Sequence, residues 1–150
     1  MSDLDKKNCC SNYRSECPLS CVLELLGDKW TLLIIRDVLT GKHRYGDFEK
    51  SPEQIPTNIL AERLKRLVRE EIMEKVCYQQ RPPRYAYKLT PKGADLIEIL
   101  KHLTLWGVKY EVGMGKPPEK LWNLSSKDIL KNQETTISKL LTNKGQTSDA

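Results

Sequence analysis

The chain has 150 residues, with 25 lysines and arginines against 20 aspartates and glutamates, and 39% of its residues are hydrophobic. This length and composition predict one compact domain with a modest core, and they exclude a globally disordered chain. The longest aliphatic run, Leu32 to Ile35, is far shorter than the roughly 18–20 apolar residues of a membrane-spanning helix, which excludes a membrane protein. At this length an oligomeric interface could add further burial.

The N-terminus and the cysteines indicate a reducing compartment. The first ten residues contain no apolar stretch and no small-residue cleavage pattern, so no signal peptide is predicted and a cytoplasmic location is expected. An odd number of cysteines fits free thiols rather than a disulfide framework. Cys9 and Cys10 are adjacent, and together with Cys17 and Cys21 they lack the paired spacing of structural zinc, so no metal and no cofactor is expected.

The predicted elements begin after a polar arm of residues 1–16. Cys17 and Pro18 are typical of a helix start. Proline has no backbone N–H, and in the first turn of a helix this costs nothing because an N–H there would have no partner within the helix. An apolar stripe follows at helical spacing, and Gly27 is expected to end the helix in a left-handed conformation. The stripe consists of Leu19, Val22, Leu23 and Leu26.

A second and a third helix are predicted next. Asp28 can cap a core helix that runs through Trp30 to Leu39 and ends near Gly41. Residues 44–48 allow a short helix, which the Ser51-Pro52 and Ile55-Pro56 turns terminate.

The segment from Thr57 to Thr90 carries most of the excess positive charge of the chain. A helix from Thr57 to about Glu70 is predicted to bury Leu60, Leu64, Leu67 and Val68. Its outward face is then polar and basic: Thr57, Asn58, Ala61, Glu62, Lys65 and Arg69. Alternating residues 72–80 and 85–89 around a turn at Arg81-Pro82-Pro83-Arg84 predict a β-hairpin with a basic tip.

One long helix is predicted to start at Thr90-Pro91 and to continue to Tyr110. Its apolar stripe is longer than a small domain usually covers, which indicates packing against a partner. Residues 113–118 are a predicted linker, and Ser125 to Asp128 are typical of a capping box ahead of a further apolar pattern. For that tail, both a helix and disorder remain open.

A helix with a polar, basic face followed by a hairpin with arginines at its tip is the order of a winged helix-turn-helix, a mainly α fold with a small hairpin. Such a helix fits the major groove of duplex DNA, and the arginines can reach phosphates or the minor groove.

Several ordered motifs resemble the HxlR family of bacterial transcriptional regulators. They are Cys17-Pro18, Leu26-Gly27-Asp28-Lys29-Trp30, Gly41 with Arg44-Tyr45 and Phe48, Ile55-Pro56-Thr57-Asn58-Ile59-Leu60 with Arg63-Leu64 and Leu67, and Arg81-Pro82-Pro83-Arg84-Tyr85 with Tyr87 and Leu89-Thr90-Pro91-Lys92-Gly93. The resemblance implies a winged helix-turn-helix domain over residues 17–113, with residues 114–150 outside it. This sequence departs from the family pattern after the predicted recognition helix, where it has Glu70-Glu71 and family members commonly have glycine or a similar turn residue.

The resemblance also implies a homodimer on an inverted-repeat operator, with the first and last helices at the dimer interface. The interface residues are then Leu19, Val22 and Leu23 on the first helix and Leu96, Leu100, Leu103, Trp106 and Tyr110 on the last.

The outward helical face and the hairpin tip supply the candidate DNA contacts, although a charged helical face is often only a solvated surface. Thr57, Asn58, Ala61 and Glu62 are expected near base edges and Lys65 at a phosphate. Arg81 and Arg84 are expected to contact DNA, because Pro82-Pro83 stiffens the hairpin tip that presents them. Arg44 and His43 are expected to bind a phosphate. Arg63 and Arg66 could instead support neighbouring helices.

Cys17 is the candidate for redox sensing, since the positive end of a helix favours the reactive thiolate, and similar cysteines sense oxidants or electrophiles in some relatives of the family. The alternative is an inert cysteine in an interface.

The leading hypothesis is therefore a homodimeric, sequence-specific regulator of transcription, expected to be a repressor, to which a small-molecule effector or an oxidant could signal. The alternative is a winged-helix module that binds a protein partner instead of an operator. An enzyme is not expected, because no metal-ligand, nucleophile-elbow or phosphate-loop motif is found.

Overall fold

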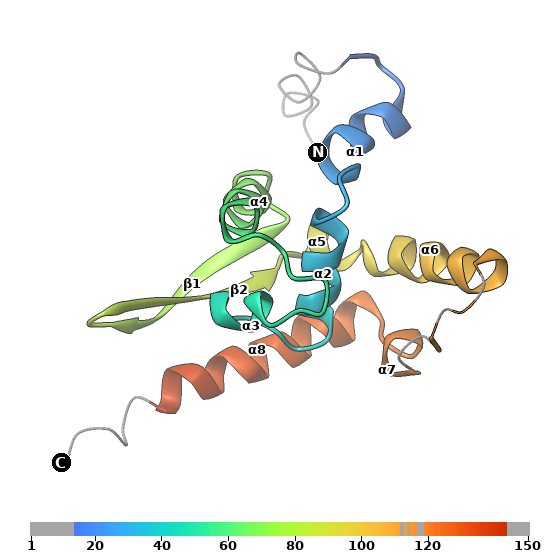
Figure 1. The fold of residues 1–150 in the computed structure, drawn as a ribbon. Helices are drawn as coiled ribbons and strands as arrows, with labels where there is room; N and C mark the ends of the chain where they lie inside the picture. Colours follow the sequence, from blue (N-terminus) through green and yellow to red (C-terminus); the bar gives the residue numbers. More distant parts are fainter. Residues whose placement is uncertain (1–13, 112, 114, 117–118, 144–150) are drawn as a thin grey trace, which may run out of the picture.

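A computed structural model describes residues 14–111, 113, 115–116 and 119–143 (Figure 1). The predicted class, mainly α with one two-stranded antiparallel hairpin, is confirmed. The elements in chain order are α1 (Pro18–Leu26), α2 (Thr31–Leu39), α3 (Tyr45–Glu49), α4 (Thr57–Arg69), β1 (Met73–Gln80), β2 (Pro83–Leu89), α5 (Pro91–Ala94), α6 (Ile97–Tyr110), α7 (Glu119–Trp122) and α8 (Ser126–Thr142). None of these helices is long and apolar enough to cross a membrane.

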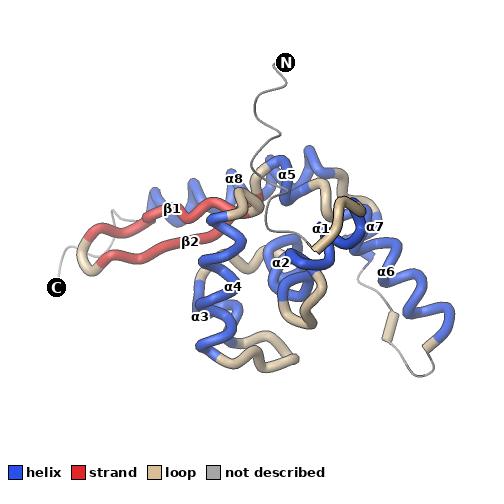
Figure 2. The backbone as a smooth tube through the Cα atoms, turned by 90° about the horizontal axis from the view of Figure 1, so that it is seen from above, coloured by secondary structure: helices blue, strands red, loops and turns tan. Residues whose placement is uncertain are grey.

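The hairpin and α6 extend from opposite sides of a helical body (Figures 1 and 2). One hydrophobic core joins α2, α3, α4, the base of the hairpin, α6 and the C-terminal helices, and each large aliphatic side chain buried there contributes about 1.5–3 kcal/mol. Its fully buried members include Ile34, Ile35, Phe48, Leu60, Leu64, Leu67, Ile72, Leu89 and Ile97.

Helix α1 begins after Cys17 as predicted, but the prediction of a left-handed stop at Gly27 is wrong. Gly27 has φ −76°, in the right-handed region, and its N–H donates to the carbonyl of Leu23 at 2.8 Å. A Cβ at Gly27 would lie 2.3 Å from the same carbonyl oxygen, so glycine serves a close backbone approach here.

The prediction that Asp28 is the cap residue of α2 is corrected: the helix begins at Thr31 and its N-cap residue is Trp30, while Asp28 bonds both from two residues earlier. One carboxylate oxygen of Asp28 accepts the N–H groups of Trp30 and Thr31 at 2.9 and 3.1 Å. These donors have no partner within the helix, so the carboxylate satisfies part of its first turn. Gly41, where a left-handed turn is needed, has φ +97°.

The hairpin has a tighter turn than predicted. Gln79 pairs with Arg84 and Gln80 with Pro83, so only Arg81 and Pro82 lie outside the ladder. Proline is tolerated in β2 because Pro83 is the first residue of the strand. The register shifts between Cys77 and Gln79, which leaves Tyr78 as the extra residue of a bulge.

The single long helix predicted from Thr90 is wrong, because the structure divides it into α5 and α6. The Thr90 hydroxyl accepts the N–H of Gly93 at 3.1 Å, as expected for a cap. A Cβ at Gly93 would lie 2.1 Å from the carbonyl oxygen of Ile72, so α5 packs directly against the base of β1. The hydrogen bond from the Leu96 N–H to the Gly93 carbonyl spans three residues, as in a 3₁₀ turn, and the chain changes direction there before α6.

The tail, for which helix and disorder were both open, is helical in α7 and α8. Ser125 and Asp128 form the predicted capping box, with bonds of 2.9 and 3.2 Å. Both helices lie beyond the expected domain of residues 17–113, yet Leu121 and Ile129 belong to the same hydrophobic core.

Candidate nucleic-acid interface

The outward face of α4 is as polar as the sequence pattern predicts. Leu60, Leu64 and Leu67 are at most 1% exposed and fasten the helix to the core. The residues expected near DNA, namely Thr57, Asn58, Ala61, Glu62 and Lys65, are all exposed. They occupy one face because they are spaced around the buried stripe at helical intervals.

Two arginines of α4 hold the helix in place. The Arg63 guanidinium lies 3.2 Å from Asp28, and the Arg66 guanidinium donates to the carbonyl of Glu24 at 2.5 Å. Burial opposes ionisation of Asp28, but hydrogen bonds from Thr31, Trp30 and Arg63 outweigh it and lower the pKa of that carboxyl. Arg63 and Arg66 therefore bind neighbouring segments, while Lys65 between them projects outward.

Arg44 precedes α3, the short helix that contacts α4. Asp47 accepts the backbone N–H of Arg44 and bonds its guanidinium, each at 3.1 Å. The Tyr45 hydroxyl donates to the carbonyl of Thr57 at 3.0 Å and so links α3 to the first turn of α4. Arg44 thus has a fixed direction and remains exposed.

The expectation that the His43 side chain binds phosphate is wrong. His43 is 3% exposed, and its Nδ1 lies 2.9 Å from the carbonyl oxygen of Tyr87 on β2. Burial lowers the pKa of His43, so a neutral ring that donates through Nδ1 fits this site.

A cavity of about 360 Å³ separates α3 from the hairpin. Arg44 and Arg84 line it together with the rings of Tyr45, Tyr78 and Tyr85. The Tyr85 ring also carries a cation contact, since the Lys75 Nζ lies 4.1 Å from the ring centre. Guanidinium groups and phenol hydroxyls around one hollow match the chemistry of a sugar-phosphate backbone.

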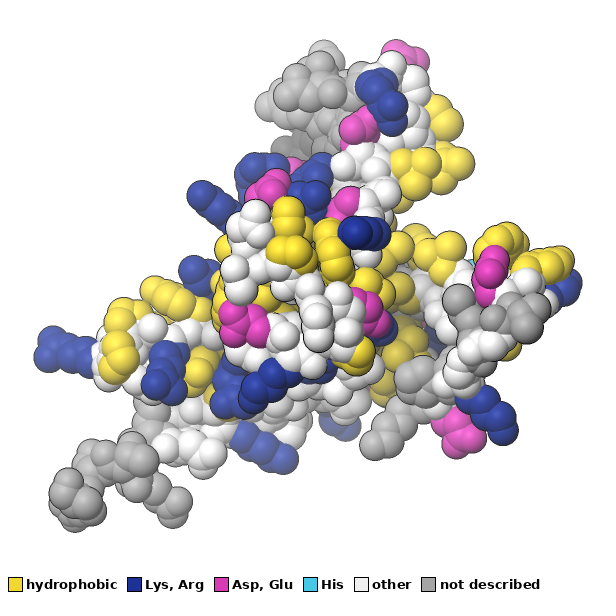
Figure 3. Space-filling model, viewed as in Figure 1, with side chains coloured by type: hydrophobic (Ala, Val, Ile, Leu, Met, Phe, Trp, Pro, Cys, Tyr) yellow, Lys and Arg dark blue, Asp and Glu magenta, His cyan; other side chains and the backbone are white. Residues whose placement is uncertain are grey.

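Arg81, the other arginine of the tip, is exposed in the turn itself. Figure 3 shows dark-blue lysine and arginine side chains along the hairpin and over α4.

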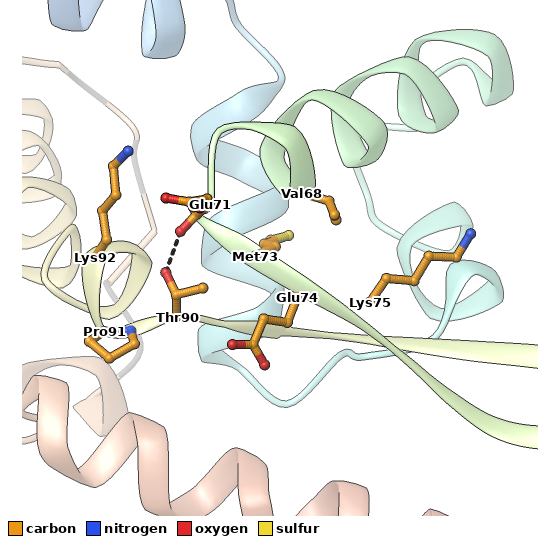
Figure 4. A pocket seen from close by; sticks show the side chains of 8 residues that line it. All are labelled: Val68, Glu71, Met73, Glu74, Lys75, Thr90, Pro91 and Lys92. Carbon is orange, nitrogen blue, oxygen red and sulfur yellow. Dashed lines mark hydrogen bonds between the residues drawn. The ribbon is translucent and has the colours of Figure 1, made fainter. Parts of the chain in front are cut away.

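A larger cavity, about 760 Å³, lies at the far end of α4 (Figure 4). Its lining mixes Glu71 and Glu74 with Lys75 and Lys92, and the Thr90 hydroxyl donates to the Glu71 carbonyl across it at 2.6 Å. Because two carboxylates lie in this wall, it suits a polyanion less well than the hollow beside α3.

The exposed apolar side chains gather on α1 and α6 (Figure 3). Leu19 and Leu23 are 65% and 51% exposed, and Trp106 and Tyr110 are 60% and 58% exposed. The predicted interface also holds two residues that the core of this chain already uses: Leu100 is 8% exposed, and Leu96 is half-buried against the core. Leu105 and Val108, which the sequence interpretation did not name, are further exposed apolar side chains of α6.

Cys17 is an exposed free thiol at the start of α1, and the half-buried Cys21 lies one turn later. Cys9 and Cys10 lie outside the described residues. Within the described ranges, no group of three or more His, Cys, Asp or Glu side chains could hold a metal ion.

Comparison with known proteins points to one group. A family model described as HxlR-like helix-turn-helix matches residues 25–113. YdeP, an HTH-type transcriptional regulator of Bacillus subtilis, is 32% identical over 95 residues, which cover 63% of this chain and 74% of YdeP.

Two solved structures are similar in both sequence and fold. The reduced form of the transcriptional regulator YodB from B. subtilis is 29% identical, with a TM-score of 0.56 over 67% of this chain and all of YodB. The redox regulator HypR in its oxidised form is 28% identical, with a TM-score of 0.58 over 63% of this chain and 98% of HypR.

Proposed function

The chain belongs to the HxlR-like helix-turn-helix family of transcriptional regulators, and we propose that it is a homodimeric repressor that binds an inverted-repeat operator in duplex DNA. The observation that carries this proposal is the continuity of one surface. Tyr45 lines the arginine-bearing cavity and also bonds the carbonyl of Thr57, the first residue of α4, so α3 connects the hollow beside the hairpin to the start of the polar helix.

In this proposal the first half of α4 enters the major groove. Asn58 can form two hydrogen bonds with adenine, Glu62 can accept from the amino group of cytosine, and Ala61 can contact a thymine methyl group. Thr57 lies at the same end of the helix and can bond either base or backbone. Lys65, one turn further along, binds phosphate and adds affinity without sequence preference.

The hairpin, or wing, binds the backbone beside that groove. Arg84 and Arg44 converge on one cavity and bind a phosphate there, while Arg81 extends from the turn toward the next phosphate or the minor groove.

In the proposed dimer, each copy of the chain supplies one α4 as a recognition helix. The exposed side chains of α1 and α6 form the proposed dimer interface: Leu19, Val22, Leu23, Leu103, Trp106 and Tyr110. A two-fold dimer presents two α4 helices to two half-sites about 34 Å apart, one turn of the double helix.

Cys17 is the proposed oxidant sensor. A hydroperoxide would convert its thiol to a sulfenic acid with release of water or an alcohol. The location supports the proposal, because the exposed thiol begins the helix that carries half of the apolar interface. The similarity of the chain to the redox regulator HypR supports the sensor proposal further.

Fluorescence anisotropy tests the operator proposal. Reduced protein is titrated into duplex DNA from its own upstream region and into a scrambled duplex, at about 50 and about 200 mM salt. We expect selective binding that weakens by about 10³-fold or more between these salt concentrations, as for proteins with several phosphate contacts. Equal affinity for both duplexes would contradict the operator and favour a protein-binding module.

The sensor proposal has its own test. Peptide mass spectrometry after mild peroxide or quinone treatment should find Cys17 modified first, and Cys17→Ser should keep DNA binding under oxidation while Cys21→Ser does not. An unmodified Cys17, or a Cys17→Ser protein whose DNA binding still changes on oxidation, would contradict the sensor proposal.

A further inference from the structure

The outer edge of β2 is closed near the helical body by groups from two distant parts of the chain. In an antiparallel pair, alternate residues direct their N–H and C=O groups away from the partner strand. On β2 these residues include Tyr87 and Leu89. The N–H of Tyr87 donates to the carbonyl of His43 at 2.7 Å, and the His43 ring lies 2.9 Å from the Tyr87 carbonyl oxygen.

The second closure comes from the C-terminal helix. Gln133 accepts the N–H of Leu89 through Oε1 at 2.8 Å and donates from Nε2 to the Leu89 carbonyl at 2.6 Å. One side-chain amide therefore replaces both hydrogen bonds that a third strand would form at this residue. Gln133 is 4% exposed, so removing its amide would take away the partner of two backbone groups that lie away from bulk water.

Helix α8 lies alongside the hairpin, as Figures 1 and 2 both show. Ile129 and Ile137, one turn before and one turn after Gln133, are 4% and 5% exposed. The three side chains form one buried face, which fixes the amide opposite Leu89. All three lie outside residues 25–113, the span that the family model matches.

We propose that α8 braces the wing and that Gln133 is a positioning residue for DNA binding. A two-stranded hairpin is marginally stable in water by itself, so the direction of its arm depends on what holds its base. The amide of Gln133 fixes β2 at Leu89, and β2 carries Arg84 and leads back to Arg81. Arg81 and Arg84 then lose less conformational entropy when they bind DNA. This inference rests on the proposed DNA contacts of the wing.

The first test needs no DNA. Gln133→Leu removes the amide and keeps an apolar contact, whereas Asn132→Leu makes the matched change at the exposed neighbouring position. Backbone ¹⁵N relaxation should show order parameters at residues 77–86 falling from about 0.85 to below about 0.6 in Gln133→Leu only. Wing amides as rigid as in the wild type would overturn the brace.

The second test is a double-mutant cycle on operator affinity. We expect Gln133→Leu to weaken binding about tenfold and Asn132→Leu to leave it within about twofold. In an Arg81→Ala/Arg84→Ala background the effect of Gln133→Leu should shrink to less than about twofold, because the groups it positions are gone. An undiminished effect there would mean that Gln133 acts through overall stability, and the proposal would fail.

Gln133→His serves if Gln133→Leu does not fold. A neutral ring in that space has one donor and one acceptor nitrogen that point too far apart to bond both backbone groups of Leu89, so loss of wing order and of affinity should be intermediate. Wild-type protein that binds no duplex would contradict the proposed function, while the relaxation measurement would still decide whether the brace exists.

Discussion

At the scale of single residues, an ion network around the buried Asp37 joins α2 to the turn before α4. Asp37 is 2% exposed, and it accepts hydrogen bonds from the Ser51 hydroxyl and from the Arg36 guanidinium, the latter at 2.8 Å. Arg36 also binds Glu53 through two bonds of 2.6 and 2.8 Å. The sequence pattern did not predict this network, because an aspartate within an apolar helix looks exposed until the positions of Ser51 and Glu53 are known.

The network predicts a pH dependence of stability. The hydrogen bonds from Arg36 lower the pKa of Glu53 from 4.5 to about 2. Because the folded pKa is below the unfolded one, this contribution is present above about pH 4.5 and is lost as pH falls toward 2. Urea unfolding between these limits should show wild-type stability falling more steeply with acid than that of Glu53→Gln. The exposed Glu49→Gln is the control, and parallel curves for all three would contradict the coupling.

Glu71 occupies a conformation that suits glycine. Its φ is +58°, which confirms that the turn after α4 is left-handed at the position where the family usually has a turn residue. An L-residue there costs about 1–2 kcal/mol, partly offset by the greater freedom that glycine loses on folding. We therefore expect Glu71→Gly to raise the free energy of unfolding by about 0.5–1 kcal/mol and Glu71→Val to lower it. Chemical denaturation decides the sign, and a destabilised Glu71→Gly would count against backbone strain.

At the scale of elements, α4 and the hairpin were predictable and the α5–α6 division was not. The buried stripe of α4 and the alternation of the strands are local patterns, visible in any window of the chain. The break at Asp95-Leu96 depends on the contact of Gly93 with Ile72, which lies far away in the sequence. The docking of α8 depends in the same way on Gln133, a polar residue whose partner is a backbone segment.

Helix α4 predicts two separable effects on DNA binding. Because each protomer of the dimer contributes one Lys65, Lys65→Ala should weaken binding to operator and scrambled duplex equally and reduce the slope of log affinity against log salt by about 2. Asn58→Ala should cost about 1–3 kcal/mol for each half-site of the operator and little on scrambled DNA, because a base contact carries the sequence information. Anisotropy titrations across a salt series measure both. Equal loss on both duplexes for Asn58→Ala would remove it from the base-reading set.

At the scale of the whole molecule, the exposed side chains of α1 and α6 require an explanation. Groups of large exposed apolar side chains are uncommon on a monomer and usually mark an interface. The amphipathic stripes could be predicted from the sequence, but their division between core and interface could not. Leu100 and Leu103 are neighbours in one stripe at three-residue spacing, yet they are 8% and 51% exposed, and only the packing of α6 on the core tells them apart.

We expect Trp106→Asp to produce monomers. A charge at an interface of apolar side chains has no partner, and its desolvation opposes association. Light scattering during size-exclusion chromatography should give the mass of one chain for this variant and of two for the wild type. The matched change Asn132→Asp, on the exposed side of α8, should stay dimeric. A wild-type protein with the mass of one chain at micromolar concentration would contradict the dimer.

The closed edge of β2 has a consequence for solubility as well. An unpaired strand edge can recruit a strand from another molecule, and a two-stranded arm that extends from the body exposes such an edge readily. His43 and Gln133 occupy the backbone groups of Tyr87 and Leu89, so the inner half of this edge offers no template for intermolecular pairing. The hairpin can therefore extend far enough to reach a ligand while its base is protected from aggregation.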